Sequence, residues 1–313
     1  MIVTTQFPDL PPRPETAANA AFRRRFFDRW GTDNSVFLAS TCRADYGPLP
    51  TAPSLKMVLE GSSLIRLGRR PLRLEPGAIL WVNGGENYTV QIASARPVHC
   101  FSVHFKPSLP GEVAAVQSRA WERSLDDGAA APPRRRMPLL RESLRAPGAA
   151  LDPVLARIRA RVRRGETDAA AYEEDLFELL GELLADERRQ RGRMTALSAT
   201  RAATREELAR RVGWAADFII GSYAEPIGLA EIAAAAHLSK FHLLRAFREL
   251  HGRTPHQFLT ARRVEAARRL LADPSLDLES VAAAAGFGSR WTMQRALRQH
   301  LGATGRTLRR NAP

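Results

Sequence analysis

The spacing of apolar residues along the chain predicts two kinds of structure. From Ser54 to Phe105 the apolar residues come in short runs separated by turn residues: SLKMVLE, SLIRL, PLRL, AILWV, YTVQIA and PVHCFSVHF. Runs of about five residues at a spacing of about 8 to 12 are typical of strands in a β-sandwich or β-barrel. We therefore expect a small β-barrel over 54–105. The first fifty residues are expected to be irregular, apart from a basic helical stretch at 22–30.

After Pro153 the apolar residues recur every three or four positions, as in an amphipathic helix. One stripe, the leucine stripe, consists of Leu176, Leu179, Leu180, Leu183 and Leu184. Such a stripe can pack against the chain's own barrel or against a second copy of itself. The Arg- and Thr-rich stretch at 188–204 is expected to be a linker.

Two segments near the C-terminus repeat each other. LAEIAAAAHLSKFHLLRAFRELHGRTP (229–255) aligns with LESVAAAAGFGSRWTMQRALRQHLGATG (278–305) at an offset of 49 residues, which becomes 50 after the inserted Gly288. Each copy predicts a helix-turn-helix unit with an alanine-rich first helix. The turn falls at His237 or Gly286, because glycine suits a positive φ and histidine tolerates it. Ser239 and Ser289 are expected to cap the second helices.

The second helix of each repeat predicts an inner and an outer face. Leu243 and Phe247 in the first copy, like Met293 and Leu297 in the second, are expected inside. Arginine and glutamine can bond to base edges, and apolar side chains can contact thymine methyl groups. The alternative for any one outward residue is contact with solvent or phosphate only. The candidate contact residues are Lys240, Phe241, Leu244, Arg245, Arg290, Trp291, Gln294 and Arg295.

A third helix is expected between the two units, opened by Thr254 as cap and Pro255 in its first turn. Its apolar positions form a stripe, and its length sets the separation of the two units. Its four arginines, Arg262, Arg263, Arg268 and Arg269, are expected to face solvent or phosphate.

The formal net charge of +14 favours a polyanionic partner, nucleic acid first of all. The positive excess divides equally between 1–204 and 205–313, so charge does not locate the binding site. The repeats must locate it.

The C-terminal part, about Arg205 to Arg310, resembles the DNA-binding domain of the AraC/XylS family of bacterial transcription regulators. The two repeats and the helix between them, TARRVEAARRLL, carry the resemblance. It implies that one chain places two recognition helices in successive segments of the major groove. The sequence departs from the family at Met293 and Leu297, where phenylalanine is usual, and at Gly305, where proline is usual.

The same resemblance implies an α+β chain with an N-terminal cupin-like sensor barrel. Its domains would be a sensor at 1–150, with its β core at about 54–105, a helical dimerisation and linker region at 151–204, and the DNA-binding domain at 205–313. The chemical class of the effector stays open. The candidate effector-lining residues are Arg66, Trp81, Glu86, Asn87, Tyr88 and His104.

The candidate metal ligands in the barrel do not form a set. His99 and His104 lie five residues apart, so on one strand they point to opposite faces. Cys42 and Cys100 are expected to be buried or half-buried thiols without a disulfide. We therefore expect no cofactor, no metal and no enzymatic activity. A barrel that only dimerises, or a metal-dependent barrel enzyme fused to a DNA-binding domain, stays the alternative.

The expected partners are double-stranded promoter DNA, RNA polymerase, an unidentified small-molecule effector and a second copy of the chain. Dimerisation could use the barrel or the helix at 172–190. Activation is the more frequent mode of action in the family. The N-terminus lacks the pattern of a secretory signal, and no apolar run reaches the roughly 18 to 20 residues of a membrane span. We expect a cytoplasmic protein that joins the bacterial nucleoid when it binds DNA.

Overall fold

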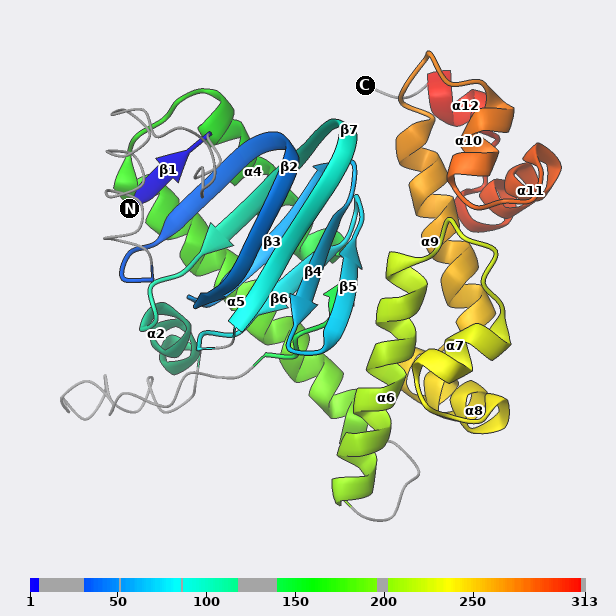
Figure 1. Ribbon diagram of the computed structural model, residues 1–313, viewed down its shortest axis with the longest axis horizontal. Coiled ribbons are helices and arrows are strands. Elements are labelled where there is room, and N and C mark those ends of the chain that lie inside the picture. The colour runs from blue at the N-terminus through cyan, green and yellow to red at the C-terminus, as the bar shows by residue number, and fades with distance from the viewer. Residues whose placement is uncertain (6–30, 51, 86, 118–139, 196–201, 311–313) are drawn as a thin grey trace. The chain divides into compact units, whose positions relative to one another are not determined.

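The computed structural model divides the chain into two compact units, Met1–Gln190 and Arg191–Pro313 (Figure 1). The predicted division into three parts at 150 and 204 stays a prediction. The basic stretch at 22–30 and Glu86 lie outside the described residues. The structure describes residues 1–5, 31–50, 52–85, 87–117, 140–195 and 202–310.

In the described part of the first unit, eight strands form one sheet, which confirms the β-structure predicted over 54–105. Its order is β1-β2-β7-β3-β6-β8, and β4 pairs with both β5 and β7. Every pair is antiparallel except β1 with β2. The strands are β1 (Ile2–Thr4), β2 (Ser35–Pro50), β3 (Ser54–Glu60), β4 (Ser63–Leu67), β5 (Arg70–Leu74), β6 (Ile79–Val82), β7 (Asn87–His104) and β8 (Leu144–Arg145).

Three strands differ from the prediction. The region expected to be irregular contains the short strand β1 and the long strand β2, and the last two expected strands form one continuous strand, β7. The ladder between them passes from the pair Arg43–Ala93 to the pair Thr41–Val98, so Pro97 lies in an irregularity of the register. A proline is tolerated there because its missing N–H is not needed for the ladder. The sequence of β2 hides the strand because small and polar residues interrupt its alternation.

Three helices among the described residues of the first unit pack against one face of the sheet: α2 (Leu109–Val116), α4 (Gly148–Arg163) and α5 (Ala169–Thr195). Figure 1 shows α4 and α5 crossing behind the strands. Leu55, Trp81 and Phe101 of the sheet share a core with Leu155 of α4 and with the leucine stripe of α5. The leucines of the stripe are at most 5% exposed. Of its two expected partners, the stripe therefore packs against its own unit.

An ion-pair network joins α4 to α5. The buried carboxylate of Asp175 lies 2.6 Å from Nε of Arg157 and 2.7 Å from Nε of Arg161. Arg161 also pairs with Glu166 at 2.7 Å, in the turn between the helices. Hydrogen bonds to Asp175 and Glu178 raise the pKa of the Arg157 guanidinium. The network fixes the position of α5 along α4.

The second unit is helical. Between α6 and α12 lie two short helix pairs, α7–α8 and α10–α11, joined by α9. Leu243, Phe247 and Leu297 are fully buried in its core, together with Ile219 of α6. The helices are α6 (Ala202–Gly221), α7 (Leu229–Ala235), α8 (Lys240–His251), α9 (Pro255–Leu270), α10 (Leu278–Ala284), α11 (Arg290–Leu301) and α12 (Gly305–Arg310).

Candidate nucleic-acid interface

The first helix-turn-helix unit has the predicted turn and cap. His237 has a φ of +51°, which is uncommon for any residue other than glycine. The hydroxyl of Ser239 then accepts a hydrogen bond from the backbone N–H of His242 and caps α8. Gly252 ends the helix in the left-handed conformation, at a φ of +69°. The helix at α8 is therefore fixed at both ends by local interactions.

The second helix-turn-helix unit has the same turn and caps. Gly286 makes the turn with a φ of +79°, and Ser289 caps α11 by accepting a hydrogen bond from the N–H of Thr292. Asp277 caps the first helix, α10, in the same way through Ser280. Gly302 ends α11 with a φ of +66°. The predictions for both turns and both serine caps are confirmed.

The predicted inner face is also confirmed. Leu243, Phe247, Met293 and Leu297 are each fully buried. Phe287, which follows the second turn, is 7% exposed and joins the same core. Met293 and Leu297, which replace the phenylalanines usual in the family, therefore still fill the interior of the second helix-turn-helix unit.

The predicted outer face carries two exposed aromatic side chains at equivalent positions. Phe241 of α8 and Trp291 of α11 are each 71% exposed, although both are large and apolar. Leu244 is 38% exposed beside Phe241. The cationic residues Lys240, Arg245, Arg290 and Arg295 are exposed on the same two helices. Both helices therefore present aromatic and cationic groups together.

The arginines on the two helices differ in their partners. Nε of Arg245 lies 3.1 Å from Glu249, one turn along α8. The position equivalent to Glu249 in the second unit is Gln299, and Arg295 forms no ion pair within the part of the chain that the structure describes. The guanidinium carbon of Arg290 lies 5.0 Å from the ring centre of Trp291. Helix α11 therefore presents two arginines, Arg290 and Arg295, that no carboxylate of the described chain neutralises.

Gln294 lies differently from the other candidate contact residues. It is half-buried, and its side-chain oxygen accepts a hydrogen bond of 3.0 Å from the backbone N–H of Gly305. A proline at position 305 would lack that N–H, so the glycine and Gln294 act together. The bond ties α11 to the first turn of α12.

Two arginines of α9 do not face solvent, so that expectation was wrong for them. Arg262 is 7% exposed, with its guanidinium carbon 4.9 Å from the ring centre of Tyr223. Arg263 donates hydrogen bonds of 2.7 Å and 2.8 Å to the carbonyl oxygens of Tyr223 and Glu225. Both arginines stabilise the chain that follows α6. Their spacing in the sequence carries no signal of this, because the carbonyl groups lie about forty residues away.

Of the other two arginines of α9, Arg268 faces solvent as expected, whereas Arg269 is half-buried. Arg268 is exposed and pairs with Glu265 at 2.8 Å, and Arg269 lies 3.5 Å from the same carboxylate. Surface pairs of this kind contribute little to stability. Arg268 therefore offers a control for the cations of α8 and α11.

The candidate effector residues of the first unit do not converge on one place. Tyr88 and His104 are buried and meet at the amine of Lys56, a residue that the sequence analysis missed. The only sequence signal for Lys56 is a lysine inside the apolar run SLKMVLE. Trp81 lies in the core beneath the helices, while Arg66 and Asn87 are exposed.

The two histidines of β7 point to opposite faces, as expected. His99 is exposed and lies 3.7 Å from Glu60, whereas His104 is 4% exposed. Burial and the nearby Lys56 amine hold the pKa of His104 well below its ordinary value. Among the described residues, no three His, Cys, Asp or Glu side chains are grouped so that they could hold a metal ion. None of the described helices is long and apolar enough to cross a membrane.

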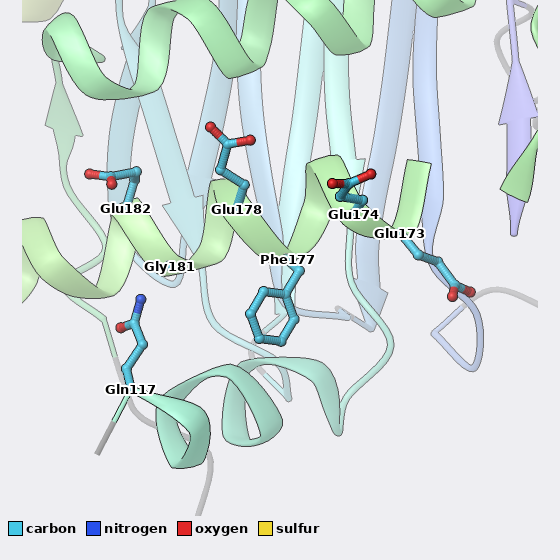
Figure 2. Close-up of a pocket in the computed structure, with 7 residues that line it drawn as sticks. All are labelled: Gln117, Glu173, Glu174, Phe177, Glu178, Gly181 and Glu182. Carbon is cyan, nitrogen blue, oxygen red and sulfur yellow. The ribbon is translucent and has the colours of Figure 1, made fainter. Parts of the chain in front are cut away.

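The outer side of α5 carries an open groove, which we call the acidic groove (Figure 2). Figure 2 shows Phe177 pointing from α5 towards α2, with glutamates spread along the same helix. Phe177 is 38% exposed, a high value for a phenylalanine on a helix whose other face is buried. The groove is lined by Gln117, Glu173, Glu174, Phe177, Glu178, Gly181 and Glu182.

Comparison with known proteins finds likenesses in the second unit. A family model described as a helix-turn-helix domain matches residues 232–311. The probable transcriptional regulator LumQ of Photobacterium leiognathi is 32% identical over 76 residues, which are 24% of this chain and 31% of LumQ. This chain therefore spans about a third of the length of that relative.

Two solved structures are each similar to about a third of the chain. The DNA-binding domain of AdpA, a global transcriptional factor in complex with a target DNA, is 32% identical over 33% of this chain and 89% of that chain, with a TM-score of 0.29. A regulator from Chromobacterium violaceum with an AraC-type DNA-binding domain is 25% identical over 36% of this chain and 96% of its own, with a TM-score of 0.31. Given the two capped units in tandem and the family model matched across residues 232–311, the C-terminal domain of this chain is an AraC-type helix-turn-helix DNA-binding domain.

Proposed function

We propose that the protein is a sequence-specific transcription regulator that reads double-stranded promoter DNA with α8 and α11. The observation that carries the proposal is the pair of equivalent aromatic residues, Phe241 and Trp291, each 71% exposed at the start of a capped helix. The exposure of a large aromatic side chain to water is unfavourable in the free protein and is typical of a binding surface. Contact with DNA would recover this energy, because apolar groups contact thymine methyls and arginines bond to guanine edges.

The assignment of base contacts follows from the outer faces. We assign base-edge contacts to Phe241, Leu244 and Arg245 of α8, and to Arg290, Trp291 and Arg295 of α11. Lys240 begins α8 at an exposed position suited to a phosphate oxygen. The side-chain oxygen of Gln294 can contact a base only if its hydrogen bond from Gly305 opens on binding.

A footprint on the promoter beside the protein's own gene tests this proposal. Arg245→Ala and Arg295→Ala should each weaken specific binding by about 1–3 kcal/mol, roughly 5- to 150-fold in Kd, because each removes a bidentate base contact. Weak binding to unrelated DNA should persist and stay sensitive to salt. The control Arg268→Ala removes an equally charged, exposed side chain of α9, outside the two recognition helices, and should leave the footprint unchanged.

Two outcomes would contradict the proposal. Unchanged footprints for both Arg245→Ala and Arg295→Ala would show that these helices do not read bases. An equal loss of affinity for promoter DNA and for unrelated DNA would show that both arginines contact only phosphates.

We also propose that the regulator acts as a homodimer through the outer side of α5. Since the leucine stripe is buried in its own unit, the exposed side of α5 is the part of this helix that remains free for a partner. That side is acidic in its first half, at Glu173 and Glu174, and basic further on, at Arg188 and Arg189. Two antiparallel copies would place the acidic half of each helix against the basic half of the other.

The remaining part of the proposal is regulation. The resemblance to the AraC/XylS family supports a sensor role for the first unit, recruitment of RNA polymerase and activation of transcription. In vitro transcription from the footprinted promoter, with and without the protein, separates activation from repression. Repeating the footprint with a panel of metabolites would identify the effector.

A further inference from the structure

The first unit holds a buried amine that the proposed function has not yet used. Lys56 of β3 is 5% exposed. Its Nζ donates a 3.0 Å hydrogen bond to the hydroxyl of Tyr88 and lies 3.3 Å from Nε2 of His104. These partners are 32 and 48 residues away in the chain, so the sheet brings both ends of β7 to one lysine.

No carboxylate balances this amine among the residues that the structure describes; its polar contacts there are the phenol and the imidazole. A lysine ammonium can only donate, so the contacting Nε2 of His104 must accept. His104 is then neutral, which agrees with its pKa being held low by burial and by Lys56. An unpaired buried cation is costly, and such cations in proteins are normally paired. An ammonium also has three N–H donors, of which these contacts use two.

A second unused polar group lies on the same face of the sheet. Ser54 precedes Lys56 by two residues on β3, so both side chains point to the same side. Ser54 stands directly opposite His104 in the register of β3 and β7. It is fully buried, and its hydroxyl has no hydrogen-bond partner in the described structure. Two donors, an ammonium and a hydroxyl, are therefore buried next to His104 with bonding capacity to spare.

The surroundings of these donors are apolar. This face of the sheet lies opposite the face that packs against α4 and α5, since its residues are absent from that core. The thiol of Cys100 reports the same environment, because burial raises its pKa to about 12 although Lys56 acts in the other direction. The buried apolar residues on this face include Val58, Ile65, Leu72, Leu74, Leu80, Val82 and Ile92.

We propose that Lys56 binds the carboxylate group of a small, otherwise apolar effector inside the first unit, with the Ser54 hydroxyl as second donor. One cation and one hydroxyl match a monoanion better than a phosphate dianion, which usually takes several cationic or backbone donors. This inference rests on the proposed regulator function and specifies its effector as an organic carboxylate.

Calorimetric titration of the full chain in the absence of DNA tests the inference. The probes are pentanoate and cyclohexanecarboxylate, and pentanamide and cyclohexanecarboxamide are their neutral counterparts. The wild-type chain should bind at least one carboxylate and bind the matching amide at least tenfold more weakly. Lys56→Met keeps the length and apolar stem but loses the charge, and should weaken carboxylate binding at least tenfold. The control Lys106→Met removes an exposed lysine paired with Glu112 and should change nothing.

The outcomes separate this inference from the proposed function. If neither carboxylate binds the wild-type chain, or if the amides bind equally well, the inference is overturned. The same holds if Lys56→Met, shown to be folded by circular dichroism, binds carboxylate as tightly as wild type. The footprint of Lys56→Met without ligand should match wild type. A wild-type chain that binds carboxylate but gives no footprint would overturn the regulator proposal and leave the carboxylate site standing.

Discussion

Gly286 shows how one residue sets the geometry of the second helix-turn-helix unit. Its φ of +79° is unfavourable for any residue with a Cβ. An added Cβ would also collide with the carbonyl oxygen of Tyr223, and it would lie only 2.8 Å from Cα of Ala224 and 3.0 Å from Nε of Arg263. The glycine therefore serves both the turn and the close approach of the chain after α6.

Gly286→Ala should lower the free energy of unfolding of the helical unit Arg191–Pro313 by about 3 kcal/mol or more, because backbone strain and overpacking act together. Gly252→Ala is the matched control, because its φ of +69° is similar but nothing lies within 4 Å of an added Cβ. That variant should lose only about 1 kcal/mol. Urea unfolding measures both. Equal losses would mean that the packing around Gly286 relaxes freely.

At the scale of elements, the junction of α4 and α5 depends on a single buried carboxylate. Asp175 is 2% exposed and receives both Arg157 and Arg161. Next to it, hydrogen bonds from Arg164 and Arg161 lower the pKa of Glu166. A carboxyl whose pKa is lowered by folding stabilises the fold above its unfolded pKa, and this contribution is lost as pH falls through the folded value. The turn between α4 and α5 should therefore weaken only in acid.

Asp175→Asn should destabilise the first unit by about 2–4 kcal/mol, because it leaves two guanidinium groups facing a neutral amide. Glu112→Gln in the same unit is the control, since Glu112 and Lys106 form an exposed pair worth less than about 1 kcal/mol. Thermal unfolding followed by circular dichroism compares the two. A loss for Asp175→Asn no larger than that of the control would show that the network adds nothing to the packing of α4 on α5.

At the scale of the whole molecule, the proposed dimer depends on the outer side of α5. The change suggested by the leucine stripe alone, Leu180→Asp, would now be uninformative, because Leu180 is fully buried and its loss would unfold the unit. Charge reversal on the exposed side avoids this problem.

Glu174→Arg should weaken dimerisation roughly tenfold, since the two-fold symmetry repeats each lost pair and each exposed pair contributes up to about 1 kcal/mol. Arg188→Glu should do the same, and the double variant should recover most of the loss. Sedimentation velocity at micromolar concentration measures the association. A wild-type chain that is monomeric there, or two single variants that dimerise as tightly as wild type, would exclude α5 as the interface.

The sequence by itself determined the features that local interactions control. The turns at His237 and Gly286, the caps at Ser239 and Ser289, and the division of α8 and α11 into inner and outer faces depend on residues a few positions apart. Helical period and capping chemistry act over that range, so they can be read directly. The strands over 54–105 were visible for the same reason.

Only the tertiary structure decided what depends on distant segments. It paired β2 with β7, buried Arg262 against Tyr223 and turned Arg263 to carbonyl groups about forty residues away. It also brought Lys56 to Tyr88 and His104, which no spacing in the sequence connects. The physical reason is that strand pairing and the burial of charge depend on which surfaces meet in space, and a local pattern of residues carries no record of those encounters.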